Sequence, residues 1–210
     1  MAQHLLQIKA VKLSPQEPFT WASGWRSPIY CDNRKTLSHP EVREFIKLRF
    51  AGIVRDHFKD VEVIAGVATG GIAHGALVAD ELGIPFIYVR TSAKGHGLKN
   101  QVEGDLSAGK RVVVIEDLIS TGGSSLNAVD ALRDAGSEVL GMAAIFTYGF
   151  DVAGEAFKKA GVKLHTLTNY SVLLEQAISN GTIQPGELPK LNEWRQDPAN
   201  WSQPQRQASR

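Results

Sequence analysis

The feature that most constrains this chain is a regular alternation of apolar runs and segments of helical length between residues 60 and 170. Continuous β-branched, apolar runs are typical of strands covered on both faces, as in a parallel sheet. The expected strands are Val61–Ile64, Ile84–Val89, Val112–Ile115, Val139–Phe146 and Val162–Leu167. The expected helices between them are Gly71–Leu82, Gly123–Ala135 and Asp151–Ala160, each ending at or near a glycine (Gly83, Gly136, Gly161). The pattern predicts an α/β fold with a parallel central sheet flanked by helices.

The two ends of the chain do not follow this alternation. Residues 1–40 are rich in aromatic and turn residues, and a helix is expected at Pro40–Phe58. The segment after Asn180 is rich in Pro, Gln and Asn. We therefore predict a small N-terminal hood at 1–40, an α/β core at 41–180 and a C-terminal tail at 181–210, with the last ten residues a loose terminus.

Composition narrows the possible partners. Lys and Arg total 23 against 22 Asp and Glu, a net charge of +1, which does not suggest the basic face of a nucleic-acid-binding protein. Cys31 is the only cysteine, so no intramolecular disulfide can form, which suits a reducing compartment. No segment approaches the roughly 20 apolar residues of a membrane span. We expect a cytoplasmic protein that binds neither nucleic acid nor membrane.

The most informative segment begins where the apolar run Val112–Ile115 meets the carboxylates of Glu116 and Asp117. A hydroxyl- and glycine-rich turn follows and opens a helix, and such a junction is an anion site in α/β sheets. Carboxylates repel phosphate, so the acids must face a metal ion or a pair of sugar hydroxyls. A ribose 5-phosphate would satisfy both halves of the segment. The plainer alternative is a strand followed by a polar turn and a helix cap, which the acid pair makes less convincing.

This segment resembles the motif with which type I phosphoribosyltransferases bind phosphoribosyl diphosphate (PRPP). The resemblance implies that Glu116 and Asp117 hold the ribose hydroxyls and that the loop holds the 5-phosphate. The residues expected to bind PRPP in the strand end and loop are Leu118, Ile119, Ser120, Thr121, Gly122, Gly123 and Ser124. In the same family a second glycine turn binds the diphosphate, and Thr69, Gly70 and Gly71 resemble it. Some members carry a Lys where Gly70 stands, so here the cation must come from elsewhere.

The connection from Arg90 to Lys110 is too long for a passive link in a compact domain. It is basic and contains four glycines, which suggests a lid that closes on polyphosphate, although a solvated surface loop is the plainer reading. Its pattern R-x-x-x-K-x-H-G followed by E-G resembles the catalytic loop of orotate phosphoribosyltransferases. The resemblance implies that Arg90, Lys94 and His96 contact the diphosphate and that the loop reaches into a neighbouring subunit's site, hence a homodimer. Many members have a second basic residue where Thr91 stands.

The segment Phe19–Arg34 carries the pattern F-T-x-x-S-G-x-R-S-P-x-Y, with aromatics that would pack against the sheet. It resembles the orotate-binding start of the same enzymes, which assigns Arg26 and Tyr30 to the orotate side. Some members have Lys where Ala22 stands.

Together the resemblances imply transfer of ribose 5-phosphate from PRPP to orotate in pyrimidine (UMP) biosynthesis. Lys94, His96 and Asp117 would be catalytic, and Mg²⁺ would lie on PRPP oxygens and water without protein ligands. Two alternatives remain open: a phosphoribosyltransferase for another base, and a PRPP-sensing regulator that binds RNA or DNA.

Overall fold

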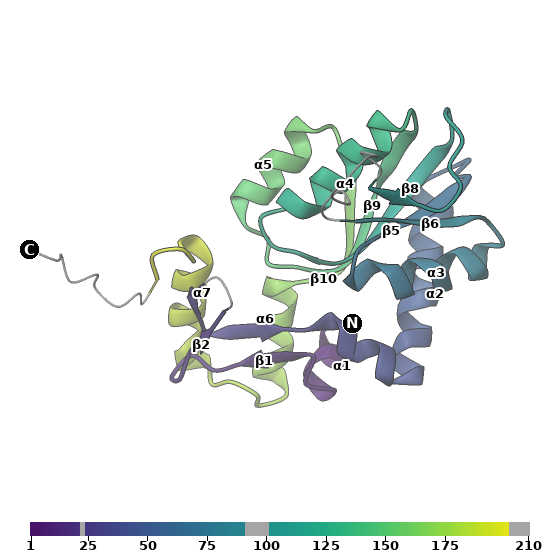
Figure 1. Ribbon diagram of the computed structural model, residues 1–210. Coiled ribbons are helices and arrows are strands. Elements are labelled where there is room, and N and C mark those ends of the chain that lie inside the picture. Colours follow the sequence, from purple (N-terminus) through teal and green to yellow (C-terminus); the bar gives the residue numbers. More distant parts are fainter. Residues whose placement is uncertain (22–23, 91–100, 202–210) are drawn as a thin grey trace, which may run out of the picture.

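The computed structural model describes residues 1–21, 24–90 and 101–201. Within them a six-stranded sheet has the strand order β10-β9-β8-β5-β6-β7 (Figure 1). Its strands are β5 (Val63–Val67), β6 (Phe86–Val89), β7 (Val102–Glu103), β8 (Arg111–Ile119), β9 (Glu138–Thr147) and β10 (Leu164–Asn169). All neighbours are parallel except β6 and β7, which pair antiparallel. The predicted α/β fold with a parallel central sheet is confirmed.

Helices cover both faces of this sheet, which explains why its strands are continuously apolar. The helices of this part are α2 (Pro40–His57), α3 (Gly70–Leu82), α4 (Gly123–Asp134) and α5 (Asp151–Lys159). Along β8, Val113 and Ile115 face the core that contains α2 and α3. Val112 and Val114 face the opposite core, which contains α4 and α5. Both sets are essentially inaccessible to solvent, as the two-sided packing of a parallel sheet requires.

The predicted helices agree with the observed ones to within one residue at each end. The glycines after α3 and α5, Gly83 and Gly161, adopt positive φ, and so does Gly136 two residues beyond α4. Strand β8 extends furthest beyond its predicted end, because it continues through the acid pair to Ile119. It does so because β9 stays paired with it as far as Thr147.

The two chain ends pack together beneath the sheet (Figure 1). Their elements are α1 (Ala2–Gln7), β1 (Val11–Leu13), β2 (Phe19–Thr20), β3 (Arg26–Ser27), β4 (Ile29–Cys31), α6 (Tyr170–Ser179), η2 (Pro185–Glu187) and α7 (Leu188–Gln196). We call residues 1–31 and 170–201 the terminal layer. The short 3-10 helix η1 (Asn33–Ser38) joins this layer to α2. The segment expected as a tail thus carries α7, while the proposed division at 40 and 180 stays a prediction.

The centre of the terminal layer is aromatic. Trp194 on α7 is fully buried, and its ring lies 5.5–5.8 Å from those of Trp21, Tyr148, Phe150 and Tyr170. The Tyr170 hydroxyl donates to the Leu191 carbonyl at 3.0 Å, which ties the start of α6 to α7. The C-terminal helices are therefore fixed to the N-terminal hairpins by buried aromatic contacts.

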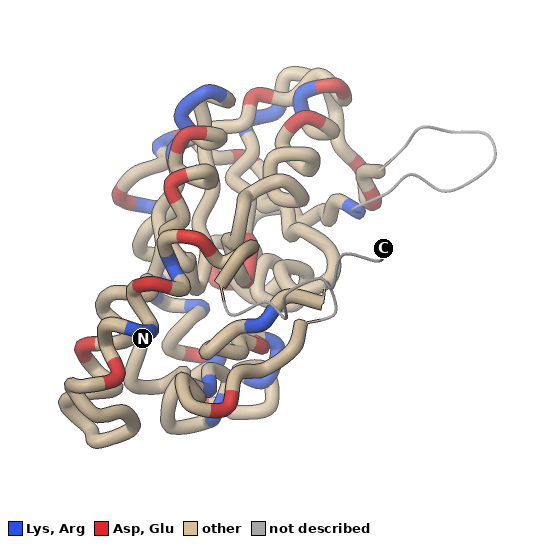
Figure 2. The backbone as a smooth tube through the Cα atoms, turned by 90° about the vertical axis from the view of Figure 1, so that its left-hand side faces the viewer, with Lys and Arg blue, Asp and Glu red and all other residues tan. Residues whose placement is uncertain are grey.

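Charged side chains are mixed rather than segregated by sign. On the side of the molecule seen in Figure 2, basic and acidic residues are interspersed along the described chain. None of the helices within the described residues is long and apolar enough to cross a membrane.

Candidate active site

The sheet has a topological switch point between β5 and β8. The chain leaves β5 toward β6 on one side, whereas β8 leads to β9 and β10 on the other. Ligands of open α/β sheets bind at such a point, beyond the carboxyl ends of the two strands. Both glycine turns singled out in the sequence lie there, one between β5 and α3 and the other between β8 and α4.

The loop after β8 is shaped by Gly122. Its φ of +84° lies in the left-handed region that favours glycine, and α4 begins at the next residue. A Cβ at position 122 would also come within 2.9 Å of the Phe157 ring. The first N–H groups of α4 therefore lie beside the hydroxyl residues Ser120, Thr121 and Ser124, an arrangement of donors that suits an anion.

Glu116 is the more buried member of the acid pair, with 5% of its surface exposed. Its Oε2 accepts a hydrogen bond from Ser125 Oγ at 2.9 Å, and its Oε1 accepts one from the Asp117 N–H at 2.9 Å. Burial, reinforced by the charge of Asp117, raises the pKa of Glu116 well above its ordinary value. Both of its carboxylate oxygens already accept hydrogen bonds from the protein, so Glu116 is placed to hold the neighbouring Asp117 in position.

Asp117 is half-buried, and burial raises the pKa of its carboxyl as well. The Asn33 side-chain amide donates to its carbonyl oxygen at 2.6 Å and so joins β8 to the N-terminal segment. A Cβ at position 70 would lie 2.2–2.4 Å from the Asp117 carboxyl atoms. Gly70 therefore leaves the space that the Asp117 carboxylate occupies, and a lysine at position 70 would displace that carboxylate.

The turn after β5 brings the start of α3 against β8. A Cβ at Gly71 would approach the Ile115 carbonyl oxygen to 2.3 Å, and one at Gly66 would approach the Gly71 carbonyl oxygen to 2.7 Å. These are backbone atoms, so glycine is required for the close packing. The peptide bond between Ala68 and Thr69 is cis.

A single pocket of about 410 Å³ joins these features. Its lining comes from the turn after β5, the end of β8 with its loop, and the N-terminal segment. The lining residues are Cys31, Asp32, Arg34, Val67, Ala68, Thr69, Gly70, Glu116, Asp117, Leu118, Ser120 and Ser124. Both acids and both glycine turns, which are separated by almost 50 residues in the sequence, thus meet in one cavity, which we call the acid-pair pocket.

Arg34 is a lining residue that the sequence did not single out. Its Nε donates to Asp32 Oδ1 at 2.7 Å, and 61% of its side chain stays exposed. It lines the same pocket as Gly70. Position 70 is the one at which some members of the family that the sequence resembles carry a lysine. The only sequence signal for it is its position at the end of the aromatic N-terminal segment.

The other predicted residues lie elsewhere. Arg90 follows β6. Its N–H donates to the Gln101 carbonyl, its carbonyl accepts from the Gln101 side-chain amide, and its Nη1 lies 3.5 Å from Glu103 Oε1. Lys94 and His96 lie outside the described residues. Arg26 on β3 and Tyr30 on β4 do not line the acid-pair pocket. The buried Nε of Arg26 has no hydrogen-bond partner in the described part of the chain.

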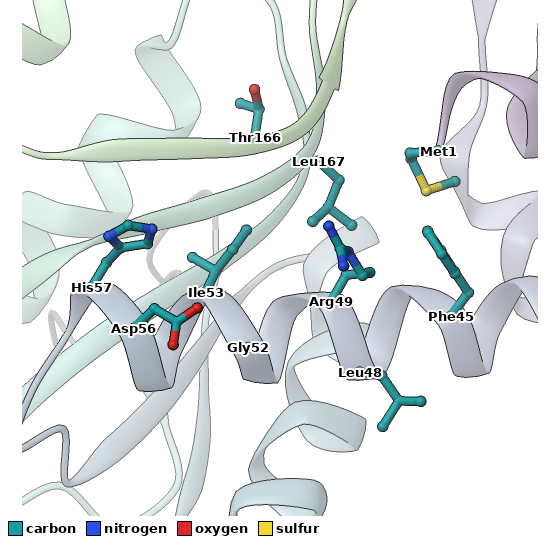
Figure 3. A pocket seen from close by; sticks show the side chains of 10 residues that line it. All are labelled: Met1, Phe45, Leu48, Arg49, Gly52, Ile53, Asp56, His57, Thr166 and Leu167. Carbon is teal, nitrogen blue, oxygen red and sulfur yellow. The ribbon is translucent and has the colours of Figure 1, made fainter.

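Two further cavities lie outside the acid-pair pocket. One, of about 340 Å³, lies along α2 and β10 and is bordered by Phe45, Arg49 and His57 among others (Figure 3). It contains none of the predicted site residues. The other, of about 290 Å³, lies between the terminal layer and the loop after β8, from which Thr121 contributes. We call this second cavity the aromatic pocket, since Trp25 and Phe150 form part of its lining.

No group of three or more His, Cys, Asp or Glu side chains in the described ranges is arranged to hold a metal ion. The acid-pair pocket does offer carboxylate oxygens from Asp32 and Asp117. Such oxygens suit a hard cation that keeps most of its ligands on phosphate and water.

Comparison with known proteins assigns the family. The sequence profile described as "Phosphoribosyl transferase domain" matches residues 38–176. The chain is 61% identical over 200 residues to an orotate phosphoribosyltransferase from Phocaeicola vulgatus, covering 95% of this chain and 94% of the relative. It is 54% identical to one from Listeria monocytogenes, with 96% of each covered.

Solved structures agree with this assignment. The crystal structure of orotate phosphoribosyltransferase from Aeropyrum pernix superposes with a TM-score of 0.74 at 32% identity, covering 83% of this chain and 96% of that one. A Mycobacterium tuberculosis orotate phosphoribosyltransferase in complex with PRPP gives a TM-score of 0.59 at 29% identity, with 69% and 82% covered. On its sequence, its fold and its relatives, the chain belongs to the orotate phosphoribosyltransferase family.

Proposed function

We propose that this protein transfers the ribose 5-phosphate group of PRPP to orotate, giving orotidine 5′-phosphate and diphosphate in pyrimidine biosynthesis. The observation that carries the proposal is the acid-pair pocket, in which Glu116 and Asp117 lie between two glycine turns. A ligand with a sugar diol between two phosphate groups matches that order of groups.

PRPP lies with its 5-phosphate on the N–H groups and hydroxyls of residues 120–124, at the start of α4. The Asp117 carboxylate accepts hydrogen bonds from the ribose hydroxyls, and Glu116 holds Asp117 through the Asp117 N–H. The diphosphate occupies the turn at Thr69 and Gly70, with Arg34 as the nearby cation. This placement accounts for the absence of a lysine at position 70.

In the reaction N1 of orotate gives up its proton to solvent, and its lone pair attacks the anomeric carbon while the bond from that carbon to the diphosphate oxygen breaks. The electron pair of the broken bond leaves with the diphosphate, and positive charge develops on the ribose ring. Arg90, Lys94 and His96 stabilise the departing diphosphate, and the Asp117 carboxylate favours the cationic ribose. No protein nucleophile is needed.

Mg²⁺ bound to the PRPP oxygens supplies further neutralisation of charge on the leaving group. Asp32 and Asp117 are the pocket residues whose carboxylates could add a ligand to the ion, and its other ligands would be phosphate oxygens and water. Arg26 and Tyr30 are assigned to the orotate side of the site, on the strength of the sequence resemblance alone.

The protein acts as a cytoplasmic homodimer in which the basic loop of one subunit serves the site of the other.

A mixing experiment tests this arrangement. Lys94→Ala should lower turnover about 10²–10³-fold, the effect of losing one transition-state charge contact. If loops are shared, mixing Lys94→Ala protein with Asp117→Asn protein, at a PRPP concentration too low for the latter to turn over, should restore up to about a quarter of the activity. Half of the dimers are then hybrids, and each hybrid has one intact site. No recovery after subunit exchange would contradict a shared loop.

The direct test follows orotate absorbance with purified protein, PRPP and Mg²⁺, beside adenine, hypoxanthine and uracil. We expect loss of orotate that requires both PRPP and Mg²⁺ and stops on chelation by EDTA. Reaction of another base instead would change the substrate assignment. PRPP binding without any reaction, together with PRPP-dependent RNA or DNA retention on a filter, would favour a regulator.

A further inference from the structure

The aromatic pocket contains a cation that the proposed mechanism does not use. Arg195, near the end of α7, lines this cavity together with Trp25, Phe150 and Gly149. The cavity also includes Thr121 from the phosphate loop, so it adjoins the place where the ribose 5-phosphate lies. With a volume of about 290 Å³ it suits a ligand of one ring rather than a nucleotide.

The guanidinium of Arg195 is held in place yet keeps free donors. Its Nη1 donates to Ser171 Oγ at 3.2 Å, and within the described chain it has no carboxylate within ion-pair distance. The remaining N–H groups are not buried and have no protein partner among the described residues. Asp151 is the acid in the pocket lining, but it does not pair with Arg195. An arginine with unused donors in a partly apolar cavity is suited to a planar carboxylate.

Gly149 keeps the space beside the guanidinium open. It has a φ of +68°, and a Cβ placed there would lie 3.9 Å from Arg195 Nη1. The Gly149 N–H donates to Thr147 Oγ1 at 3.0 Å, which fixes the turn after β9. A side chain at position 149 would therefore enter the cavity between β9 and α7.

We propose that Arg195 is a specificity-determining residue that binds the carboxylate of orotate in the aromatic pocket, and this assignment rests on the proposed function. The pyrimidine ring lies between the walls formed by Trp25 and Phe150. The carboxylate is attached to C6, next to the N1 that attacks the ribose, so a cation holding it also orients the nucleophile. A base without this carboxylate, such as uracil, cannot make the contact with Arg195.

The 5-phosphate is the other anion within reach of this cavity, and the structure favours the carboxylate. The phosphate loop already offers helix N–H groups and three hydroxyls to the phosphate. Apolar surfaces such as Trp25, Phe150 and Pro198 suit a flat ring better than a strongly hydrated dianion.

Steady-state kinetics of Arg195→Gln, with each substrate varied in turn, tests the assignment. We expect kcat/KM for orotate to fall roughly 10- to 100-fold, the effect of losing a charged hydrogen bond to the substrate. The KM for PRPP should stay within about twofold of its original value. Arg195→Lys keeps the charge without the planar fork and should recover part of the loss.

Ser171→Ala is the matched control, because it removes the hydrogen bond to the guanidinium and leaves the cation. It should change the orotate KM little; a loss equal to that of Arg195→Gln would make Arg195 structural and overturn the proposal. A raised PRPP KM with an unchanged orotate KM would assign Arg195 to the 5-phosphate instead. Unchanged kinetics of Arg195→Gln for both substrates would also overturn the assignment of Arg195 to the orotate carboxylate. Failure of the unmodified protein to use orotate would refute the proposed function itself.

Discussion

The α/β core and the terminal layer contribute to the site in different ways. In the core, the functional groups lie in the last residues of a strand or directly after it: Asp117 lies near the end of β8, the loop at Ser120 follows β8, and the turn at Thr69 follows β5. In the terminal layer, contacts join residues far apart in the chain, as between Trp21 and Trp194. The core therefore builds its phosphate and ribose contacts from local strand–turn–helix junctions. The terminal layer brings Trp25 and Arg195, from the two chain ends, to the neighbouring aromatic pocket, and the core supplies the rest of its lining.

Trp194→Ala should have the largest effect and should separate the two regions. Removing a fully buried tryptophan costs about 3–5 kcal/mol of folding stability. Because the lost contacts lie in the terminal layer and at Tyr148 and Phe150, away from the acid-pair pocket, the orotate KM should rise while PRPP binding is kept. Urea unfolding and calorimetry with PRPP measure the two effects. Leu132→Ala, equally buried on α4, is the control and should leave the orotate KM nearly unchanged. Equal loss of PRPP binding in Trp194→Ala would contradict the separation.

Two adjacent glycines sharpen the comparison within the core. Gly71→Ala places a methyl group against the Ile115 carbonyl oxygen, so α3 must move, at a cost of about 1–3 kcal/mol. Gly70→Ala meets the Asp117 carboxyl, a side chain that can rotate away. We therefore expect a lowered melting temperature for Gly71→Ala, and weakened PRPP binding with nearly normal melting for Gly70→Ala. If the two variants melt alike, the packing account of Gly71 is wrong.

Asp117→Asn tests the ribose contact without changing the shape of the side chain. We expect PRPP affinity to fall roughly 10-fold or more, since an ionised acceptor of the sugar hydroxyls is lost. Titration calorimetry with PRPP measures the change. Asp130→Asn, an exposed position on α4, should bind PRPP normally. Unchanged PRPP affinity in Asp117→Asn would refute the ribose assignment.

The smallest expected effect concerns Glu116 and pH. The pKa of this carboxyl is raised above its ordinary 4.5 in the folded protein, so the folded state holds the proton more tightly than the unfolded state. Stability therefore falls as pH rises from about 4.5 through the raised pKa. Glu116→Gln removes this penalty and should raise the melting temperature of the ligand-free protein at neutral pH. The gain should vanish near pH 4.5. Thermal melts between pH 4.5 and neutral pH measure this gain in stability. A gain that does not depend on pH would contradict the raised pKa of Glu116 as its cause.

The same difference between regions explains what could be predicted from the sequence. The helices of the core were predicted to within one residue, because their periodicity and terminal glycines are local signals. The two glycine turns and the acid pair could be located because each directly follows an apolar run. That they share one pocket follows from parallel strands ending at the same edge of a sheet.

The terminal layer and its residues were harder to predict. Helices α6 and α7 were not predicted, since what stabilises them is long-range aromatic packing around Trp194. Arg34 and Arg195 were missed for the same reason: only the fold brings them to the pockets. The roles of Lys94 and His96 stay predictions from the sequence.

The meeting of the two chain ends has a consequence for how the enzyme is made. Residues 1–31 leave the ribosome long before residues 170–201, yet much of the surface that they cover belongs to that later segment. The core can assemble during translation, because its strands and helices alternate in chain order. The aromatic pocket, by contrast, needs Arg195 and can form only after residues 170–201 have been synthesised, so a chain that stops before them would retain the turns and acids of the acid-pair pocket and lack the proposed carboxylate contact.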